Sequence, residues 1–238
     1  MLLFFVRHGD PTYAPDALTP LGRRQAEAVA RRIALYGVDK IYSSTSTRAY
    51  QTAKPTAEIL RKPIERMEFC HENLAWKDLS MVMDNGIRTW AFMVPEVARL
   101  FNSEEIRALG DKWYTHPAFD GHNYGYGIER IRRDTHAFLA QLGYEFDPEK
   151  HCYRVTRANN DRIALFAHQG FGLAFLSCLL DIPYPMFSTH FDMGHTGMTV
   201  IEFRDVDGYA IPRTLTLAND SHIYRDGLPT FYQNEIRF

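Results

Sequence analysis

The chain has 238 residues, of which 45% are hydrophobic and 24% charged, a composition typical of a globular protein and not of a disordered or fibrous one. Its formal net charge of -2 gives no basis for counterion-driven binding to nucleic acid. Three cysteines without disulfide or metal-ligand spacing indicate a reduced compartment, and no apolar run approaches the length of a membrane span. We therefore expect a cytoplasmic protein that binds neither nucleic acid nor membranes.

The first part of the chain alternates predicted strands and helices. An unbroken apolar run at residues 2–6 indicates a strand that is buried on both faces. Thr19 is a helix N-cap signal, and apolar residues at helical spacing follow it until Gly37. A second strand is expected at residues 38–42, and Pro55 should kink or divide the helix that follows it.

The pattern changes after a short predicted strand at residues 64–67. From residue 73 to residue 127 strand signals disappear, and short helical stretches alternate with loops. We interpret residues 73–127 as an insertion that caps the edge of the sheet within a single domain, residues 1–238. The glycine-rich residues 121–127 indicate a mobile lid. The aromatic residues of this insertion either form a substrate wall or pack its own core: Trp76, Trp90, Trp113, Phe119, Tyr124 and Tyr126.

Regular alternation returns in the second half of the chain. Residues 128–142 have the spacing of an amphipathic helix, residues 163–167 form a buried strand, and residues 170–180 form an apolar helix. Two apolar runs at residues 198–203 and 214–217 flank a turn and predict an antiparallel hairpin at one edge. The predicted fold class is α/β, with a mostly parallel sheet.

Chemistry-bearing side chains follow the predicted strands. Arg7 and His8 come directly after the first strand, and Arg48 opens the helix after the second. His168 follows a later strand, and Glu72 follows the short third one. Because ligands of open α/β sheets bind beyond the carboxyl ends of the strands, we expect these side chains to meet. Two guanidiniums, two imidazoles and free N–H groups of a helix N-terminus can hold a compact dianion such as phosphate.

The expected environment of these groups sets their chemistry. Arg48 lies in a first helical turn, where the helix dipole disfavours a cation, so a bound anion would relieve the conflict. Flanking arginines should lower the pKa of His8 and leave a neutral, nucleophilic imidazole, which the Gly9 carbonyl can orient. Apolar shielding should raise the pKa of Glu72, so that this carboxyl can protonate a leaving oxygen.

Four segments carry a family resemblance. They are FVRHG (5–9), LTPLGRRQA (18–26), YSSTSTRAYQTA (42–53) and AHQG (167–170). Together they resemble the histidine phosphatase superfamily, in its phosphoglycerate-mutase-like branch. The resemblance implies a three-layer α/β/α sandwich that works without a metal.

The same resemblance implies roles for individual residues. His8 would carry the phosphoryl group as a phosphohistidine, and Glu72 would be the proton donor. Arg7, Arg48 and His168 would bind the phosphate. Asp10 and Asp78 are alternatives to Glu72 as the acid. Two further candidates for substrate binding are Gln169 and His195, although His195 has a hydrogen bond within its own loop as the alternative.

The expected function is hydrolysis of a small phosphorylated substrate through phosphohistidine, without metal or cofactor. A mutase that moves phosphate within a phosphoglycerate is the second hypothesis, but Asn73-Leu74-Ala75-Trp76 follows the acid where those mutases carry Glu-Arg-x-Tyr-Gly around it. A non-catalytic phospholigand-binding protein is the third. His116 and His122 lack the spacing and acidic partners of a metal site. A homo-oligomer is compatible with the sequence.

Overall fold

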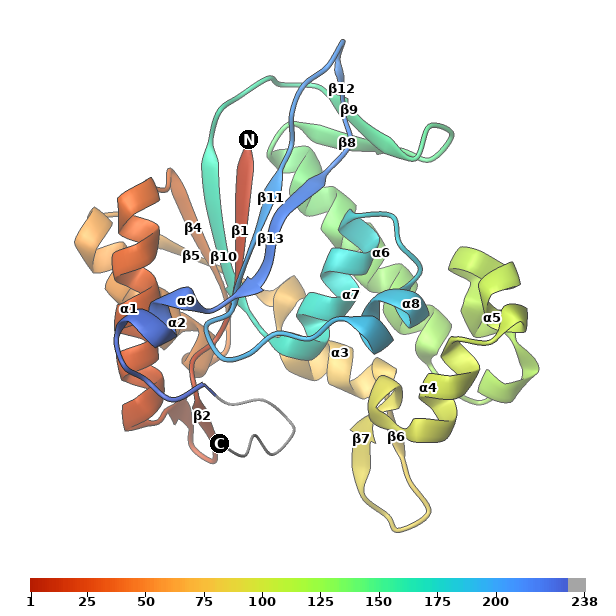
Figure 1. Ribbon diagram of the computed structural model, residues 1–238. Helices are drawn as coiled ribbons and strands as arrows, with labels where there is room; N and C mark the ends of the chain where they lie inside the picture. Colours follow the sequence, from red (N-terminus) through yellow and green to blue (C-terminus); the bar gives the residue numbers. More distant parts are fainter. Residues whose placement is uncertain (231–238) are drawn as a thin grey trace.

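A six-stranded sheet forms the centre of the computed structural model, which describes residues 1–230 (Figure 1). From one edge of the sheet to the other, the strands follow in the order β13 (Arg213–Asn219), β11 (Met198–Glu202), β1 (Leu2–Arg7), β10 (Arg162–Ala167), β4 (Lys40–Ser44) and β5 (Ile64–Met67). The pairs β1–β10, β10–β4 and β4–β5 are parallel, whereas β11 runs antiparallel to both β1 and β13. The mostly parallel sheet with an antiparallel edge confirms the predicted fold class.

Helices cover both faces of this sheet (Figure 1). On one face Phe4 and Val6 of β1 pack in one core cluster with Val29 of α1 (Pro20–Tyr36) and Ala53 of α2 (Thr47–Leu60). On the other face Phe5 packs against residues of the remaining long helices, α6 (Tyr124–Gln141) and α7 (Gln169–Leu179). Every residue of α7 is buried, which matches its apolar sequence and explains why it carries no polar face.

Residues between β5 and α6 form a largely helical segment. It contains η1 (Glu68–Cys70), α3 (Glu72–Leu79), η2 (Ala91–Met93), α4 (Pro95–Phe101), α5 (Glu104–Leu109), η3 (Gly110–Thr115) and η4 (Pro117–Phe119). We expected no strands in this segment, and that prediction is wrong. β6 (Ser80–Val82) and β7 (Arg88–Trp90) form a short antiparallel hairpin. Three paired residues per strand are too few to leave a periodic signal in the sequence.

The mobile lid predicted for residues 121–127 is also wrong. Residues from Tyr124 onward form the first turn of α6, and the Tyr124 side chain is buried. Gly127 allows α6 to lie against α3, since a Cβ there would collide with the Cβ of Asp78. Gly125 and Gly127 therefore serve close packing at the start of α6, where we expected loop motion.

Pro55 does not divide its helix. α2 continues through it from Thr47 to Leu60, and the alanines at 49, 53 and 57 hold one face in the core. The sequence also gave no warning of two small sheets beside the central one. They are the hairpin β2 (Pro11–Tyr13) with β3 (Asp16–Leu18), and the sheet of β8 (Tyr144–Asp147), β9 (Cys152–Val155) and β12 (Tyr209–Ala210).

Two short helices of the second half lie on opposite faces, α8 (Tyr184–His190) before β11 and α9 (Ser221–Arg225) after β13. α9 lies beside α1, and α8 lies beside α7 (Figure 1). Within residues 1–230, none of the helices has the length and apolar character needed to cross a bilayer.

Candidate active site

His8 is held in place by backbone contacts on both sides. Its N–H donates to the carbonyl of Ala167 at the end of β10, 2.9 Å away. Gly9 touches α1, since a Cβ there would lie only 2.6 Å from the carbonyl oxygen of Gly22. The ring Nδ1 donates to the Gly9 carbonyl at 2.7 Å. A neutral ring that donates from Nδ1 has its lone pair on Nε2, so this nitrogen is the reactive one.

Arg48 joins the two central histidines. It is the second residue of α2, whose N-cap Ser46 accepts from the N–H of Ala49. The Arg48 Nε lies 3.2 Å from His8 Nε2, and its Nη2 lies 3.1 Å from His168 Nδ1. The rings of His8 and His168 are 5.1 Å apart between centroids. Residues separated by more than a hundred positions thus form one cluster at the carboxyl edge of the sheet.

The second nitrogen of His168 faces hydroxyl groups. Its Nε2 lies 2.9 Å from the Ser44 Oγ and 3.3 Å from the Ser46 Oγ. Because Arg48 can only donate to Nδ1, His168 is neutral and donates from Nε2. These serines belong to the hydroxyl-rich stretch after β4, and they fix the tautomer of His168.

Arg7 lies beside His195. The Arg7 Nη1 donates to the Met193 carbonyl at 2.6 Å, and its Nη2 lies 3.1 Å from His195 Nε2. The His195 ring is 5.8 Å from that of His8, and its Nδ1 lies 3.6 Å from Asp10. Burial, reinforced by the charge of Arg7, lowers the pKa of His195 to about 4. His195 therefore contacts the arginine, and its loop carries it to the edge of the histidine cluster.

Burial is the main cause of the low basicity of the two central histidines. It lowers the pKa of His8 well below the usual value, and the charges of Arg7 and Arg48 lower it further. The pKa of His168 is also lowered, first by burial and then by His8 and Arg48. The expected direction for His8 agrees with this result, although the sequence argument named only the arginines. A neutral His8 keeps its Nε2 lone pair available near neutral pH.

Glu72 points at the N-terminus of α7. It is the first residue of α3, and its two carboxylate oxygens accept the N–H groups of Gly170 and Phe171, each at 3.0 Å. Burial raises the pKa of this carboxyl, while those two N–H groups and then Arg48 and Arg7 oppose the rise. A carboxyl with a raised pKa exchanges protons closer to neutrality, as a general acid requires.

The two alternative acids are engaged elsewhere. Asp10 accepts from the hydroxyl of Thr19 at 2.6 Å, and Asp78 is buried beside Arg130, 3.4 Å away. Neither aspartate lines the cavity in front of His8, whereas Glu72 does. The geometry therefore favours Glu72 among the three carboxyls.

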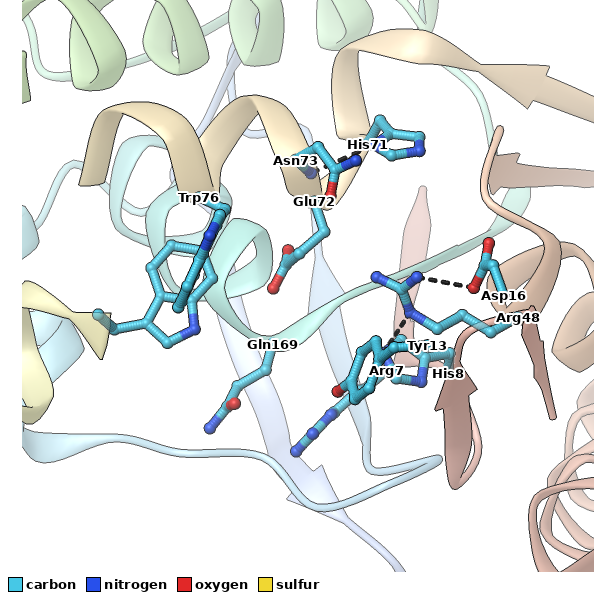
Figure 2. Close-up of a pocket in the computed structure, with 11 residues that line it drawn as sticks. Arg7, His8, Tyr13, Asp16, Arg48, His71, Glu72, Asn73, Trp76 and Gln169 are labelled. Atoms are coloured by element: carbon cyan, nitrogen blue, oxygen red, sulfur yellow. Dashed lines mark hydrogen bonds and ion pairs between the residues drawn. The ribbon is translucent and has the colours of Figure 1, made fainter. Parts of the chain in front are cut away.

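A cavity of about 450 Å³ opens in front of these groups (Figure 2). Figure 2 shows Glu72 and Arg48 directed toward its interior, with Trp76 on the side away from His8. The cavity is lined by Arg7, His8, Tyr13, Asp16, Arg48, His71, Glu72, Asn73, Trp76, Trp90 and Gln169. His168 and His195 are not among the residues that line this cavity, and both contact the lining arginines.

The aromatic residues of the insertion divide between the two expected roles. Trp76 and Trp90 line the cavity, with ring centroids 4.8 Å apart in an edge-to-face contact. Trp113 instead packs against Phe119 and Tyr124 inside the insertion, while Tyr126 is exposed. The sequence could not separate these roles because both require large aromatic side chains at irregular spacing.

One expectation about anion binding is wrong. We expected free N–H groups at a helix N-terminus, but the N–H of Thr47 in α2 donates to Asp16 Oδ2 at 2.7 Å. Asp16 Oδ1 also accepts from Arg48 Nη1 at 2.8 Å, so this carboxylate supplies the anion that the first turn of α2 requires.

The hairpin β2–β3 was absent from the sequence analysis, and with it two lining residues. Asp16 comes from β3, and the Arg48 guanidinium lies 5.3 Å from the ring centroid of Tyr13 in β2. The neighbouring Pro15 carries only a turn signal, which does not say what the turn contacts. Asn73 and His71 were likewise missed, since they flank Glu72 without any pattern of their own.

No metal cluster accompanies the site. Among the described side chains there is no group of three or more His, Cys, Asp and Glu arranged to hold a metal ion. His116 accepts the N–H of Ala118 and lies 3.5 Å from Glu105, far along the insertion from the cavity lining.

Comparison with known proteins gives a family match over part of the chain and a shared fold over most of it. Residues 3–84 match the histidine phosphatase superfamily (branch 1). No curated protein sequence gives a significant match. The solved structure named mycobacterial hydrolase 1 is similar with a TM-score of 0.60 and 21% identity, covering 92% of this chain and 98% of that one.

Two further structures are similar over most of their length. A mutant phosphoserine phosphatase from Entamoeba histolytica in complex with phosphoserine has a TM-score of 0.60 and 21% identity, covering 93% of this chain and 98% of that one. Mycobacterial glucosyl-3-phosphoglycerate phosphatase with VO3 has a TM-score of 0.58 and 21% identity, covering 90% and 97%. At this identity the likeness shows a shared fold, while the match over residues 3–84 includes Arg7, His8, Arg48 and Glu72. Residues 3–84 of the chain are therefore similar to the histidine phosphatase superfamily, and the chain shares its fold with these solved structures.

Proposed function

We propose that this protein is a metal-independent phosphatase that hydrolyses a phosphomonoester through a phosphohistidine on His8. The observation that carries the proposal is the His8 Nε2. It holds a lone pair, lies 3.2 Å from the Arg48 guanidinium and faces a cavity that Arg7 also lines. A neutral nucleophile between two guanidiniums suits attack on a dianionic phosphoryl group.

In the first step the phosphoryl oxygens bind the guanidiniums of Arg7 and Arg48, and one of them replaces the Arg48–His8 contact. The His8 Nε2 forms a bond to phosphorus while the bond from phosphorus to the ester oxygen breaks. Glu72 gives its proton to the departing oxygen, so that an alcohol leaves. His168, fixed by Ser44 and Ser46, stabilises the position of Arg48 during this transfer.

In the second step Glu72, now a carboxylate, takes a proton from water. The resulting oxygen bonds to phosphorus, the bond from His8 Nε2 to phosphorus breaks, and inorganic phosphate leaves. The positive charge needed in both steps comes from Arg7 and Arg48, which is the support for metal independence. Rates should accordingly be the same with and without a strong chelator.

The similar structures support a phosphatase over other activities. Two of them are named as phosphatases, one of phosphoserine and one of glucosyl-3-phosphoglycerate. The mutase hypothesis predicts an isomer of the substrate as product, whereas the phosphatase hypothesis predicts release of inorganic phosphate. Assay of both products from one phosphoglycerate separates them.

The decisive experiment compares the wild-type protein with His8→Ala. Wild-type protein should release phosphate from 4-nitrophenyl phosphate and carry an acid-labile, base-stable phosphoryl label after rapid quenching. His8→Ala should retain its thermal transition and lose about 10,000-fold or more in kcat, because the nucleophile is gone. Near-normal turnover by a folded His8→Ala, or a label that stays on this variant, would overturn the proposal.

A further inference from the structure

The charged side chains around the cavity do not favour a substrate that carries a second negative group beside its phosphate. Within the part of the chain that the structure describes, the lining contains two cationic side chains, Arg7 and Arg48. The lining also contains two carboxyls, Asp16 and Glu72. If the proposed function is correct, the phosphoryl group occupies both guanidiniums, and no lining cation is left for a second negative group.

The remaining polar groups of the lining include an imidazole and two carboxamides. The Nδ1 of His71 accepts the N–H of Asn73 at 3.2 Å, so this nitrogen is engaged with the backbone. Asn73 and Gln169 contribute carboxamides. The Gln169 Nε2 donates to Asp192, which leaves the carbonyl oxygen of this amide as its acceptor. The two carboxamides suit hydroxyls on a substrate and offer no charge to a carboxylate.

Two aspartates lie near the two guanidiniums. Asp16 holds the outer nitrogen of Arg48 at 2.8 Å and lies on the hairpin beside the cavity. Asp192 is exposed and stabilises the charged form of Arg7. A carboxylate on the leaving group would enter a site that already holds these two carboxylates nearby, and like charges brought together in an interface select against that ligand.

The wall opposite the nucleophile is aromatic. Trp76 and Trp90 form it from α3 and β7, and Trp90 is almost fully buried against Gly170 at the start of α7. Tyr13 covers the side of the cavity next to Arg48. Flat apolar side chains with few polar neighbours bind the flat apolar part of a ligand.

We propose that the substrate is a phosphate monoester of an uncharged alcohol with a flat, apolar ring, and that the cavity rejects esters whose alcohol carries a carboxylate. This inference rests on the proposed function of the same site, and it adds the charge and shape of the leaving group. It sets this chain apart from enzymes whose substrates are phosphorylated carboxylic acids.

The test uses two pairs of esters that differ in one carboxylate. They are phenyl phosphate with 4-carboxyphenyl phosphate, and glycerol 3-phosphate with 3-phosphoglycerate. In each pair the uncharged ester should have the higher kcat/KM, by about tenfold or more. Phenyl phosphate should exceed glycerol 3-phosphate because only its ring contacts the tryptophans. Equal or higher kcat/KM for the carboxylated member of both pairs would overturn the inference.

Binding to His8→Ala separates this inference from the proposed function, because this variant holds esters without turning them over. Calorimetry should show tighter binding of phenyl phosphate than of 4-carboxyphenyl phosphate. This preference without any turnover by the wild type would sink the phosphatase and keep the inference. Turnover by the wild type with equal binding of both esters would keep the phosphatase proposal and overturn the inference. Failure of His8→Ala to bind either ester would also overturn the inference.

A positive charge added at the rim of the cavity should increase turnover of the carboxylated ester, an effect that a purely structural role of the residue would not produce. Asn73 is exposed at the edge of the cavity, and its side chain belongs to the same turn as Glu72. Asn73→Arg should raise the ratio of kcat/KM for 4-carboxyphenyl phosphate to kcat/KM for phenyl phosphate by about tenfold. The matched control Asn73→Gln, which adds length without charge, should not raise this ratio. A similar gain in both variants would argue against charge as the cause.

Discussion

The strand ends of the central sheet and the insertion contribute to one cavity in different ways. Parallel pairing of β1, β10 and β4 brings His8 and Arg48 into the lining, with His168 in contact with Arg48. The insertion contributes Asn73, Trp76 and Trp90, which come from a helix and a short hairpin. The comparison suggests that the sheet carries the reaction and the insertion carries the selectivity, and substitutions on each side can test it.

The largest effect is expected at the sheet edge, in Arg48→Ala. This change removes the contacts to both central histidines and one phosphate-binding guanidinium, so kcat/KM should fall about 1,000-fold. Arg48→Lys should recover little, because one ammonium cannot reach His8, His168 and Asp16 together. Steady-state kinetics with 4-nitrophenyl phosphate gives the values, and a loss below tenfold would contradict the central place of Arg48.

A smaller and selective effect is expected where the insertion begins, in Glu72→Gln. The amide cannot donate a proton as an acid, so turnover of alkyl phosphates should fall about 100-fold. Hydrolysis of 4-nitrophenyl phosphate should fall much less, since nitrophenolate leaves without protonation. The raised pKa of Glu72 also predicts that wild-type activity declines as pH rises and the carboxyl loses its proton. Equal slowing of both esters would remove Glu72 from the acid role.

The hairpin β2–β3 lies between the two regions, and Asp16→Asn tests its part. Asn can still accept from the N–H of Thr47 but no longer neutralises Arg48, so the guanidinium is freer to bind phosphate. We expect inorganic phosphate to inhibit this variant about three- to tenfold more strongly than it inhibits the wild type. The kcat of the variant should stay within the same order of magnitude as that of the wild type. Unchanged inhibition would mean that Asp16 serves only as the helix cap.

The smallest effect is on stability, outside both regions. The neutral His222 lies between Thr196 and Arg32, and burial followed by the charge of Arg32 lowers its pKa to about 4. Between pH 6.5 and 4 the unfolded chain binds a proton at this position that the native state does not. The free energy of unfolding should therefore fall on acidification, by up to about 1.4 kcal/mol per pH unit for this one proton.

His222→Gln checks this stability prediction through the pH dependence of the free energy of unfolding, and not through its absolute value at one pH. Urea unfolding of both proteins at several pH values between 7 and 5 should give a shallower pH dependence for the variant. The depressed pKa values of His8, His168 and His195 act in the same direction and remain in both proteins. Identical slopes would mean that His222 titrates alike in the native and unfolded chains.

The two regions also differ in what the sequence could predict. Buried strands have long apolar runs, and the residue after each run is thereby placed at the sheet edge, which is why His8 and His168 could be named. Asp16, Tyr13 and Asn73 reach the cavity through turns and a helix start. Their positions depend on tertiary packing that leaves no period in the sequence.

The contact between Gly9 and Gly22 has a consequence for anyone who alters this protein. The backbone of the loop after β1 contacts the backbone of α1 there, so the orientation of the His8 nucleophilic nitrogen is fixed before the substrate binds. One added methyl group at either glycine would misdirect that nitrogen in a chain whose core is otherwise intact. A mutational scan would then flag two positions that never meet the substrate, and their cost would show in rate before it showed in melting temperature.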